Sequence, residues 1–263
     1  MLSVLLYFAI CMIATTVGAI SGIGGGVIIK PVFDAFSGFS VATISFLSGC
    51  TVLAMSIVSL LKSKGGDVKV EPKRGTLLAV GAAFGGVVGK MAFEAVKAAS
   101  GDDGLIGTIQ SVIMILLTAG VFLYVLYKEK IHTRNVQNMI SCLAIGLVLG
   151  LLSAFLGIGG GPINLAVLYY FFSMDTKTAA INSIYIIFFS QATSLISSFA
   201  QNNVPPFNWR TMAAMLAGGI LGGFIGRAFN KKMCTRAVDR LFHVLLVVII
   251  FISCYNLYRY IRL

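Results

Sequence analysis

The run GIGGG occurs twice in this 263-residue chain, at 22–26 within GAISGIGGGVIIKP (18–31) and at 157–161 within SAFLGIGGGPINL (153–165). Each copy follows a long apolar segment. Glycine tolerates positive φ angles and close backbone approach, but each glycine inside a helix costs about 1 kcal/mol relative to alanine. We therefore predict that each run interrupts a helix and that a new helix starts just after it. Pro162 follows the second run directly, and proline favours the first turn of a helix.

The composition indicates a membrane protein. Hydrophobic residues make up 58% of the chain and charged residues only 11%, and the mean hydropathy is +0.95. A soluble domain carries about a quarter charged residues, so this chain has too few to cover a surface in water. A membrane β-barrel would alternate apolar and polar residues in segments of about ten, and the sequence lacks that alternation. We expect an all-α polytopic protein of the cell (cytoplasmic) membrane, surrounded by lipid.

Eight segments reach the roughly 20 apolar residues that a membrane-spanning helix needs. They are 2–21, 41–61, 75–95, 105–127, 136–156, 178–200, 210–229 and 239–258. Two shorter apolar pieces, 27–36 and 162–172, follow the GIGGG runs and are too short to span alone. The first segment lacks the basic start and short apolar core of a signal peptide, so we expect it to be the first membrane helix.

A second pair of matching stretches indicates an internal repeat. GGVVGK (85–90) matches GGFIGR (222–227) at an offset of 137 positions, and the GIGGG runs are offset by 135. Two landmarks at nearly one offset predict two pseudo-symmetric repeats, 1–127 and 136–263, joined by a basic linker at 128–135. Each repeat would contain four long helices and one short re-entrant piece.

The basic residues, which give a formal net charge of +11, indicate an orientation. They gather in the connections 62–74, 128–134 and 231–236, which the positive-inside rule places in the cytoplasm. The connections 100–104 and 201–208 should then lie outside, which requires an odd number of passes between the linker and residue 201. If the piece 162–172 adds a pass, the two repeats are inverted, as in many transporters. The alternative is eight plain crossings with a positively charged outer loop.

The glycine runs also suggest a binding site. A helix that restarts after a break directs free N–H groups and the positive end of its dipole into the break, where they attract anions. Unpaired backbone groups are tolerated in a membrane only inside protein or facing a water-filled cavity. We therefore predict that the two breaks together hold a small anion. The predicted ligands are Gly22, Gly24, Gly25, Gly26, Gly157, Gly159, Gly160 and Gly161. The alternative is that the glycines only permit tight helix packing.

Polar side chains on the helices after each break extend this site. Spacings of three, four and seven residues place several of them on single helix faces, and hydroxyls and amides donate well to oxyanions. The predicted substrate ligands of this kind are Ser48, Thr51, Asn182, Ser183, Ser190 and Gln191. The alternative for each is a hydrogen bond to a neighbouring helix.

Two glycine stripes have a different interpretation. Gly81, Gly85 and Gly89 in one half, and residues 218, 222 and 226 in the other, follow the small-xxx-small spacing that lets helix backbones approach. We expect them to serve packing. Lys90 and Arg227, which follow the stripes, are expected to snorkel to the membrane interface, with attraction of anions as the alternative.

Acidic residues are missing from the middle of the long segments; Asp34, Glu94 and Asp175 are expected at helix ends or in connections. Since cation sites usually use intramembrane carboxylates, the pattern favours an anion as substrate. A coupling ion, H⁺ or Na⁺, and a homo-oligomer both remain open. No His or Cys pair has metal-ligand spacing and no nucleophile–base pair is evident, so we expect no metal, no cofactor and no enzyme. A nucleic-acid partner is also not expected, because no basic face with interleaved aromatic residues is present.

The doubled GIGGG motif, in two four-helix repeats with glycine-rich third helices, resembles the sulfite exporter TauE/SafE family over essentially the whole chain. The resemblance implies a permease for sulfite, sulfoacetate or other sulfur-containing or organic anions, with residues 22–26 and 157–161 around the anion. We thus expect a secondary transporter for a small sulfur oxyanion or organosulfonate. A passive anion channel and a non-transporting membrane scaffold are the alternatives.

Overall fold

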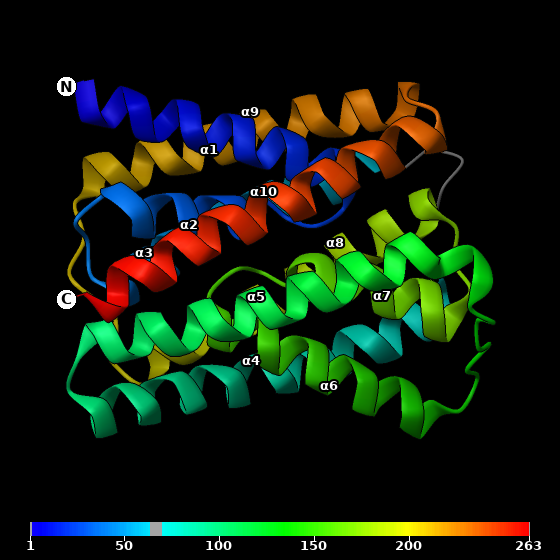
Figure 1. Ribbon diagram of the computed structural model, residues 1–263, viewed down its shortest axis with the longest axis horizontal. Helices are drawn as coiled ribbons and strands as arrows, with labels where there is room; N and C mark the ends of the chain where they lie inside the picture. The colour runs from blue at the N-terminus through cyan, green and yellow to red at the C-terminus, as the bar shows by residue number, and fades with distance from the viewer. Residues whose placement is uncertain (1, 64–69, 263) are drawn as a thin grey trace.

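The computed structural model describes residues 2–63 and 70–262, and in this part of the chain all regular secondary structure is helical (Figure 1). The helices are α1 (Leu2–Ser21), α2 (Gly26–Phe36), α3 (Val41–Ser63), α4 (Pro72–Ser100), α5 (Asp103–Tyr127), the short 3₁₀ helix η1 (Lys128–Lys130), α6 (Met139–Leu156), α7 (Gly161–Phe172), α8 (Thr176–Ala200), α9 (Trp209–Lys232) and α10 (Thr235–Ile261). Eight of them are long and apolar enough to cross a membrane. The predicted all-α polytopic class is confirmed.

The chain reverses direction at each GIGGG run. In Figure 1, α1 ends part-way along the molecule, and α2 runs back toward the end from which α1 came. The rings of Tyr7 in α1 and Phe33 in α2 accordingly lie 5.0 Å apart. Helices α6 and α7 form a second hairpin that opens toward the opposite end. At its mouth the N–H groups of Arg134 and Val136 donate to the carbonyls of Tyr170 and Phe171, at 2.7 and 2.9 Å.

The two ends of the molecule differ in charge. Both chain termini, the α4–α5 turn and the α8–α9 connection lie at the left end of Figure 1. The α5–α6, α7–α8 and α9–α10 connections and the adjoining ends of α3 and α4 lie at the right. The predicted basic connections therefore share one end, although Lys64 and Lys69 lie outside the described residues. Because α6 and α7 form a hairpin, α8 alone carries the chain from this end to residue 201. The end that faces the cytoplasm stays a prediction.

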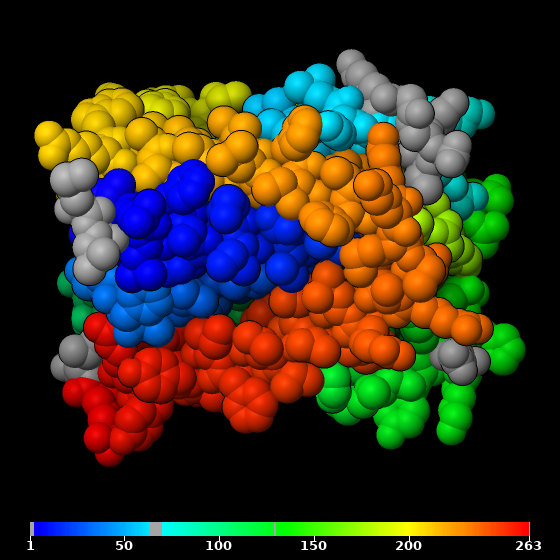
Figure 2. Space-filling view, turned by 90° about the horizontal axis from the view of Figure 1, so that it is seen from above, coloured from blue at the N-terminus to red at the C-terminus, as the bar shows by residue number. Residues whose placement is uncertain are grey.

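The glycine stripes pair the outer helices. Helix α9 lies along α1, as Figure 2 also shows, and α4 lies along α6. A Cβ atom on Gly81, Gly85 or Gly89 would collide with backbone carbonyls of α6. The colliding carbonyls belong to Leu143, Leu147 and Leu151, and the stripe on α9 meets Phe8, Met12 and Thr16 of α1 in the same way. The predicted packing role of the stripes is confirmed. The two sets of partners are again offset by 135 positions, which favours the division into repeats 1–127 and 136–263 that remains our prediction.

Helices α3 and α8 form the centre of the molecule. The most apolar window of α8 is 67% buried and that of α3 is 56% buried, compared with 33% for α1, α5 and α10. Each central helix packs against the other, and they also contact α9 and α4 respectively. The outer helices expose large apolar side chains such as Leu116, Ile140 and Phe251, as expected for surfaces in lipid. The central pair thus forms the core against which both hairpins pack.

Candidate functional site

The two GIGGG bends, residues 22–26 (the first bend) and 157–161 (the second bend), lie against each other inside the protein. A Cβ atom on Gly24 would lie 3.4 Å from the carbonyl oxygen of Gly159, and one on Gly26 would collide with the carbonyl of Ile158. Every residue of both bends is buried. The bends therefore face protein and not lipid, as an interrupted helix in a membrane requires.

Backbone angles explain why these positions are glycine. In the first bend Gly22 and Gly24 have φ angles of 83° and 85°. In the second bend all four glycines have positive φ angles: 65° at Gly157, 74° at Gly159, 107° at Gly160 and 63° at Gly161. Residues with a Cβ atom rarely adopt such angles, so the tight reversals depend on glycine.

The bends bring two helix N-termini together. Helix α2 begins at Gly26 and α7 at Gly161, and neither N-terminus has a side-chain cap. Within residues 2–63 and 70–262, the hydrogen bonds at the bends leave the N–H groups of Gly25, Gly26, Gly160 and Gly161 without an acceptor. Free N–H groups and two positive dipole ends thus converge in one buried place, which suits a negative charge.

Helices α3 and α8 contact the bends in equivalent ways. A Cβ atom on Gly157 would lie 2.5 Å from the hydroxyl of Ser45 in α3, and one on Gly22 would collide with Ala180 in α8. Two turns further on, Val52 of α3 and Ile187 of α8 contact glycines of both bends. Residues 45 and 52, and likewise 180 and 187, mark the helix faces that the bends touch.

Two predicted ligands, Ser48 and Ser183, lie on these faces. Their spacing of three and four residues from the marked positions places them between the contacts, on the same side of each helix. Both side chains are 0% exposed, and neither hydroxyl has a hydrogen-bond partner in the described part of the chain. A buried hydroxyl without a partner is costly, so these two donors are available for a ligand.

Three of the other four predicted side chains bond to neighbouring elements. Thr51 donates to the Leu47 carbonyl at 2.8 Å, and Ser190 to the Gly150 carbonyl of α6 at 3.3 Å. The Asn182 amide oxygen accepts from the Glu71 N–H at 3.2 Å, and the Gln191 amide nitrogen lies 3.2 Å from the Ser153 hydroxyl. These are the hydrogen bonds between neighbouring elements that the alternative interpretation expected for Asn182, Ser190 and Gln191, whereas Thr51 bonds within its own helix.

Sequence reasoning missed Asn164. It lies in the first turn of α7 and is 0% exposed, and neither atom of its amide has a partner among the described residues. A Cβ atom on Gly160 would collide with its amide nitrogen, so the side chain lies directly against the second bend. The signal was a lone amide at the start of an otherwise apolar helix, at a position that carries Ile29 in the first half.

The expectation that Lys90 and Arg227 snorkel is wrong. Lys90 is 7% exposed and lies 2.7 Å from Glu94, while Arg227 is 2% exposed and donates to Asn230 at 2.8 Å. The glycine stripes explain this burial. They draw the partner helices so close that the following side chain is enclosed by protein before it reaches the interface.

One of the acidic residues, Glu94, is also placed differently from the prediction. Glu94 lies inside α4, because that helix continues to Ser100, beyond the predicted end at 95. Asp34 lies in the last turn of α2, at a helix end as expected, and is buried against Lys30. Each carboxylate has a lysine partner four residues earlier, but only that of Asp34 is buried, since the Glu94 side chain is 18% exposed.

Comparisons with known proteins agree with this architecture. The family described as sulfite exporter TauE/SafE matches residues 7–252. The probable membrane transporter protein YunE of Bacillus subtilis (strain 168) is 27% identical over 272 aligned residues, which cover 94% of this chain and 95% of YunE. No solved structure matches the chain. The match over nearly the whole length, with eight helices suited to spanning, shows that the chain belongs to the sulfite exporter TauE/SafE family of multi-pass membrane transporters.

Proposed function

We propose that this protein is a secondary transporter for a small sulfur oxyanion or organosulfonate, such as sulfite, which binds between the two glycine bends. The observation that supports this most strongly is the contact between two uncapped, buried helix N-termini, those of α2 and α7. The free N–H groups there need an acceptor, and a compact oxyanion presents several acceptor oxygens to them.

Side chains complete the proposed site. Ser48, Ser183 and Asn164 are buried and lie on the surfaces that meet the bends, with no partner of their own in the described chain. Hydrogen bonds to an ionised acceptor are about twice as strong as neutral ones. The aliphatic side chains of Val52 and Ile187 exclude water from the same place, which strengthens each of these bonds. Asn182, Ser190 and Gln191 would position the helices that carry the ligands.

The arrangement of the hairpins supports alternating access. With the bends in contact, an anion enters only when one hairpin moves away from α3 and α8. Because the α1–α2 hairpin opens to one end of the molecule and α6–α7 to the other, movement of each would expose the site to a different side (Figure 1). Rocking of one repeat against the other, with the repeats inverted, is a common form of alternating access.

A stability screen tests the site. The purified full chain in detergent is heated with sulfite, thiosulfate, sulfate, a sulfonate, a carboxylate or chloride at equal ionic strength. We expect at least one sulfur oxyanion or sulfonate to raise the midpoint of unfolding above the chloride value, because a ligand that binds the folded state stabilises it. Identical midpoints for all these anions would overturn the proposal.

Flux into proteoliposomes separates a carrier from a channel. Flux through a carrier saturates as the substrate concentration rises. It also becomes faster when substrate is present on the far side, because the binding site can then return loaded instead of empty. Flux that increases linearly with concentration and shows no such acceleration would favour the channel instead.

A further inference from the structure

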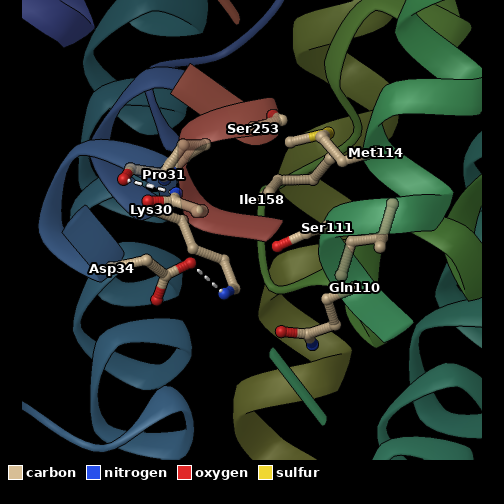
Figure 3. Close-up of a pocket in the computed structure, with 10 residues that line it drawn as sticks. Lys30, Pro31, Asp34, Gln110, Ser111, Met114, Ile158 and Ser253 are labelled. Carbon is tan, nitrogen blue, oxygen red and sulfur yellow. Dashed lines mark hydrogen bonds and ion pairs between the residues drawn. The ribbon is translucent and has the colours of Figure 1, made fainter. Parts of the chain in front are cut away.

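A second polar site lies between α2, α5 and α10, outside the glycine bends. It is a cavity of about 20 Å³, enough for one water-sized particle and too small for a sulfur oxyanion (Figure 3). Ile158, part of the second bend, lines one side of it. Its polar lining consists of Lys30, Asp34, Gln110, Ser111, Ser253 and Asn256. We call it the ion-pair cavity.

The ion pair in this cavity is almost completely buried. Lys30 Nζ lies 2.7 Å from Asp34 Oδ2, and the two side chains are 4% and 7% exposed. The guanidinium of Arg259 is engaged elsewhere, because it donates to the carbonyls of Asp34 and Ala35 at 2.6 Å each. The second carboxylate oxygen, Asp34 Oδ1, has no hydrogen-bond partner in the described part of the chain.

The side-chain amides of Asn256 and Gln110 direct their oxygen atoms toward the ion-pair cavity. Asn256 Nδ2 donates to the Pro31 carbonyl at 2.8 Å, and Gln110 Nε2 donates to the Phe155 carbonyl at 2.7 Å. Only the NH₂ group can donate to a carbonyl, so these bonds fix which end of each amide is oxygen. Both amide oxygens and the Ser253 hydroxyl lack a partner among the described residues. Four oxygen atoms of the cavity lining, Asp34 Oδ1, the two amide oxygens and the Ser253 hydroxyl, thus have no partner among the described residues.

The corresponding helix of the second half, α7, packs without such an ion pair. At the 135-residue offset of the glycine bends, Lys30 and Asp34 correspond to Leu165 and Tyr169 of α7. Both residues are buried there, and α7 packs in its hairpin without a charge at either position. Replacing a buried ion pair with apolar residues is often neutral or stabilising, and intramembrane charges usually mark function.

We propose that the ion-pair cavity binds a single Na⁺ ion. Its ligands would be the free oxygens of Asp34, Gln110 and Asn256 and the hydroxyls of Ser111 and Ser253. Oxygen atoms are the ligands that hard cations prefer, and one carboxylate already paired with Lys30 suits a monovalent ion better than a divalent one. Leu156, the last residue of α6, also lines the cavity, and the negative end of that helix dipole favours a cation.

The position of the cavity links Na⁺ to the anion. Bound Na⁺ would add one positive charge beside Lys30, and an anion at the second bend, which shares Ile158 with the cavity, would compensate it. Each ion would then raise the affinity for the other, since coupling between two sites is reciprocal. This coupling rests on the proposed function, whereas Na⁺ binding itself does not.

Thermal unfolding without any sulfur anion tests the binding. The purified full chain is heated in NaCl, KCl or choline chloride at equal concentration and pH. At ten times the dissociation constant, Na⁺ should raise the midpoint by about 3–5 °C over choline. Equal midpoints in the three salts would show that the cavity holds only water, and would overturn the proposal.

Three variants assign the effect to the cavity. Asp34→Asn keeps the size of the side chain but removes its charge, and should abolish the Na⁺ effect. Ser253→Ala removes one hydroxyl without a partner and should shift the Na⁺ titration to several-fold higher concentration even if Asp34→Asn does not fold. Glu94→Gln is the matched control, because the Lys90–Glu94 pair has the same spacing and the same 2.7 Å distance away from the cavity. Wild-type Na⁺ titrations in Ser253→Ala, or loss of the effect in Glu94→Gln, would contradict the assignment.

The Na⁺ site and the anion site can fail separately. Asn164→Leu should lose stabilisation by the anion and keep stabilisation by Na⁺, because Asn164 lies at the bend and does not line the cavity. If Na⁺ raises the midpoint of unfolding but no anion does, the Na⁺ site is supported and the anion site is rejected. If an anion raises the midpoint but Na⁺ does not, the anion site is supported and the Na⁺ site is rejected.

Discussion

At the scale of single residues, the informative groups are buried polar atoms without partners. A buried side chain that is fully hydrogen-bonded stabilises the fold, whereas one without a partner costs about 1–3 kcal/mol. Asn164, Ser48 and Ser183 belong to the second kind, and all three lie on surfaces that meet the glycine bends. A substitution there should therefore weaken ligand binding without lowering the stability of the empty protein.

Asn164→Leu should stabilise the empty protein and abolish its response to the anion. The substitution removes an amide without a partner, and the equivalent position in the first half already accepts Ile29. We expect the midpoint of unfolding without ligand to rise by about 2–4 °C per kcal/mol gained. Asn230→Leu is the control, because Asn230 bonds both Arg227 and the Ile20 carbonyl, and its loss should lower the midpoint. A fall in both variants would contradict our assignment of Asn164.

Ser48→Ala and Ser183→Ala should weaken anion binding with little change in stability. A hydrogen bond to a charged group contributes about 1.5–3 kcal/mol, so each variant should raise the dissociation constant at least about tenfold in an anion titration. Ser56→Ala serves as the control in α3, since the Ser56 hydroxyl donates to the Leu53 carbonyl of its own helix. An unchanged affinity in both test variants removes these hydroxyls from the proposed site.

The sequence predicts some of these residues better than others. Ser48 and Ser183 follow from helical spacing, which is a local property of α3 and α8. Asn164 and Lys30 were missed because each lies in a short, mostly apolar piece. Only the hairpin fold, which covers α2 and α7 on several sides, shows that both side chains are buried next to a site. Lys90 and Arg227 were misplaced because the closeness of the partner helix is a tertiary effect.

At the scale of helices, the glycine stripes determine which helices pair. They let backbone meet backbone along α4–α6 and α1–α9, and no side chain fits between. Hydrophobic length predicts the positions of the helices well because it is read locally. Length alone did not decide whether α1 and α6 cross the membrane, since 20 and 18 residues suffice to span it. Only the charge of the connections indicated the hairpins.

Gly85→Leu and Gly222→Leu should separate these helix pairs. A Cβ atom at Gly85 would meet the Leu147 carbonyl, and at Gly222 the Thr15 hydroxyl, so a larger side chain must displace backbone. Overpacking typically costs about 1–3 kcal/mol, and we expect a lower midpoint of unfolding by at least several degrees. Gly120→Leu in α5 is the control, because a Cβ atom there has no neighbour within 4 Å among the described residues. Equal midpoints in test and control variants would show that the stripes are not close contacts.

At the scale of the whole molecule, the fold has one basic end and two hairpins that open to opposite ends. This arrangement makes a prediction that eight plain crossings do not share. With α6 and α7 as a hairpin, α8 alone separates the linker 128–135 from the α8–α9 connection, so the two connections lie on opposite sides. With eight plain crossings, α6 and α8 would return the chain to the same side. The positive-inside rule assigns the linker to the cytoplasm.

Cysteine labelling in intact cells distinguishes the two arrangements. His132 in the linker and Asn203 after α8 are both exposed, so a cysteine at either position should react wherever the reagent reaches it. In a background with Cys234 and Cys254 replaced by serine, Asn203→Cys should react with a membrane-impermeant maleimide added outside. His132→Cys should react only after the membrane is opened, because its side faces the cytoplasm. If both cysteines react from the same side, the hairpin does not exist in the membrane, and the two bends do not form a site open alternately to each side.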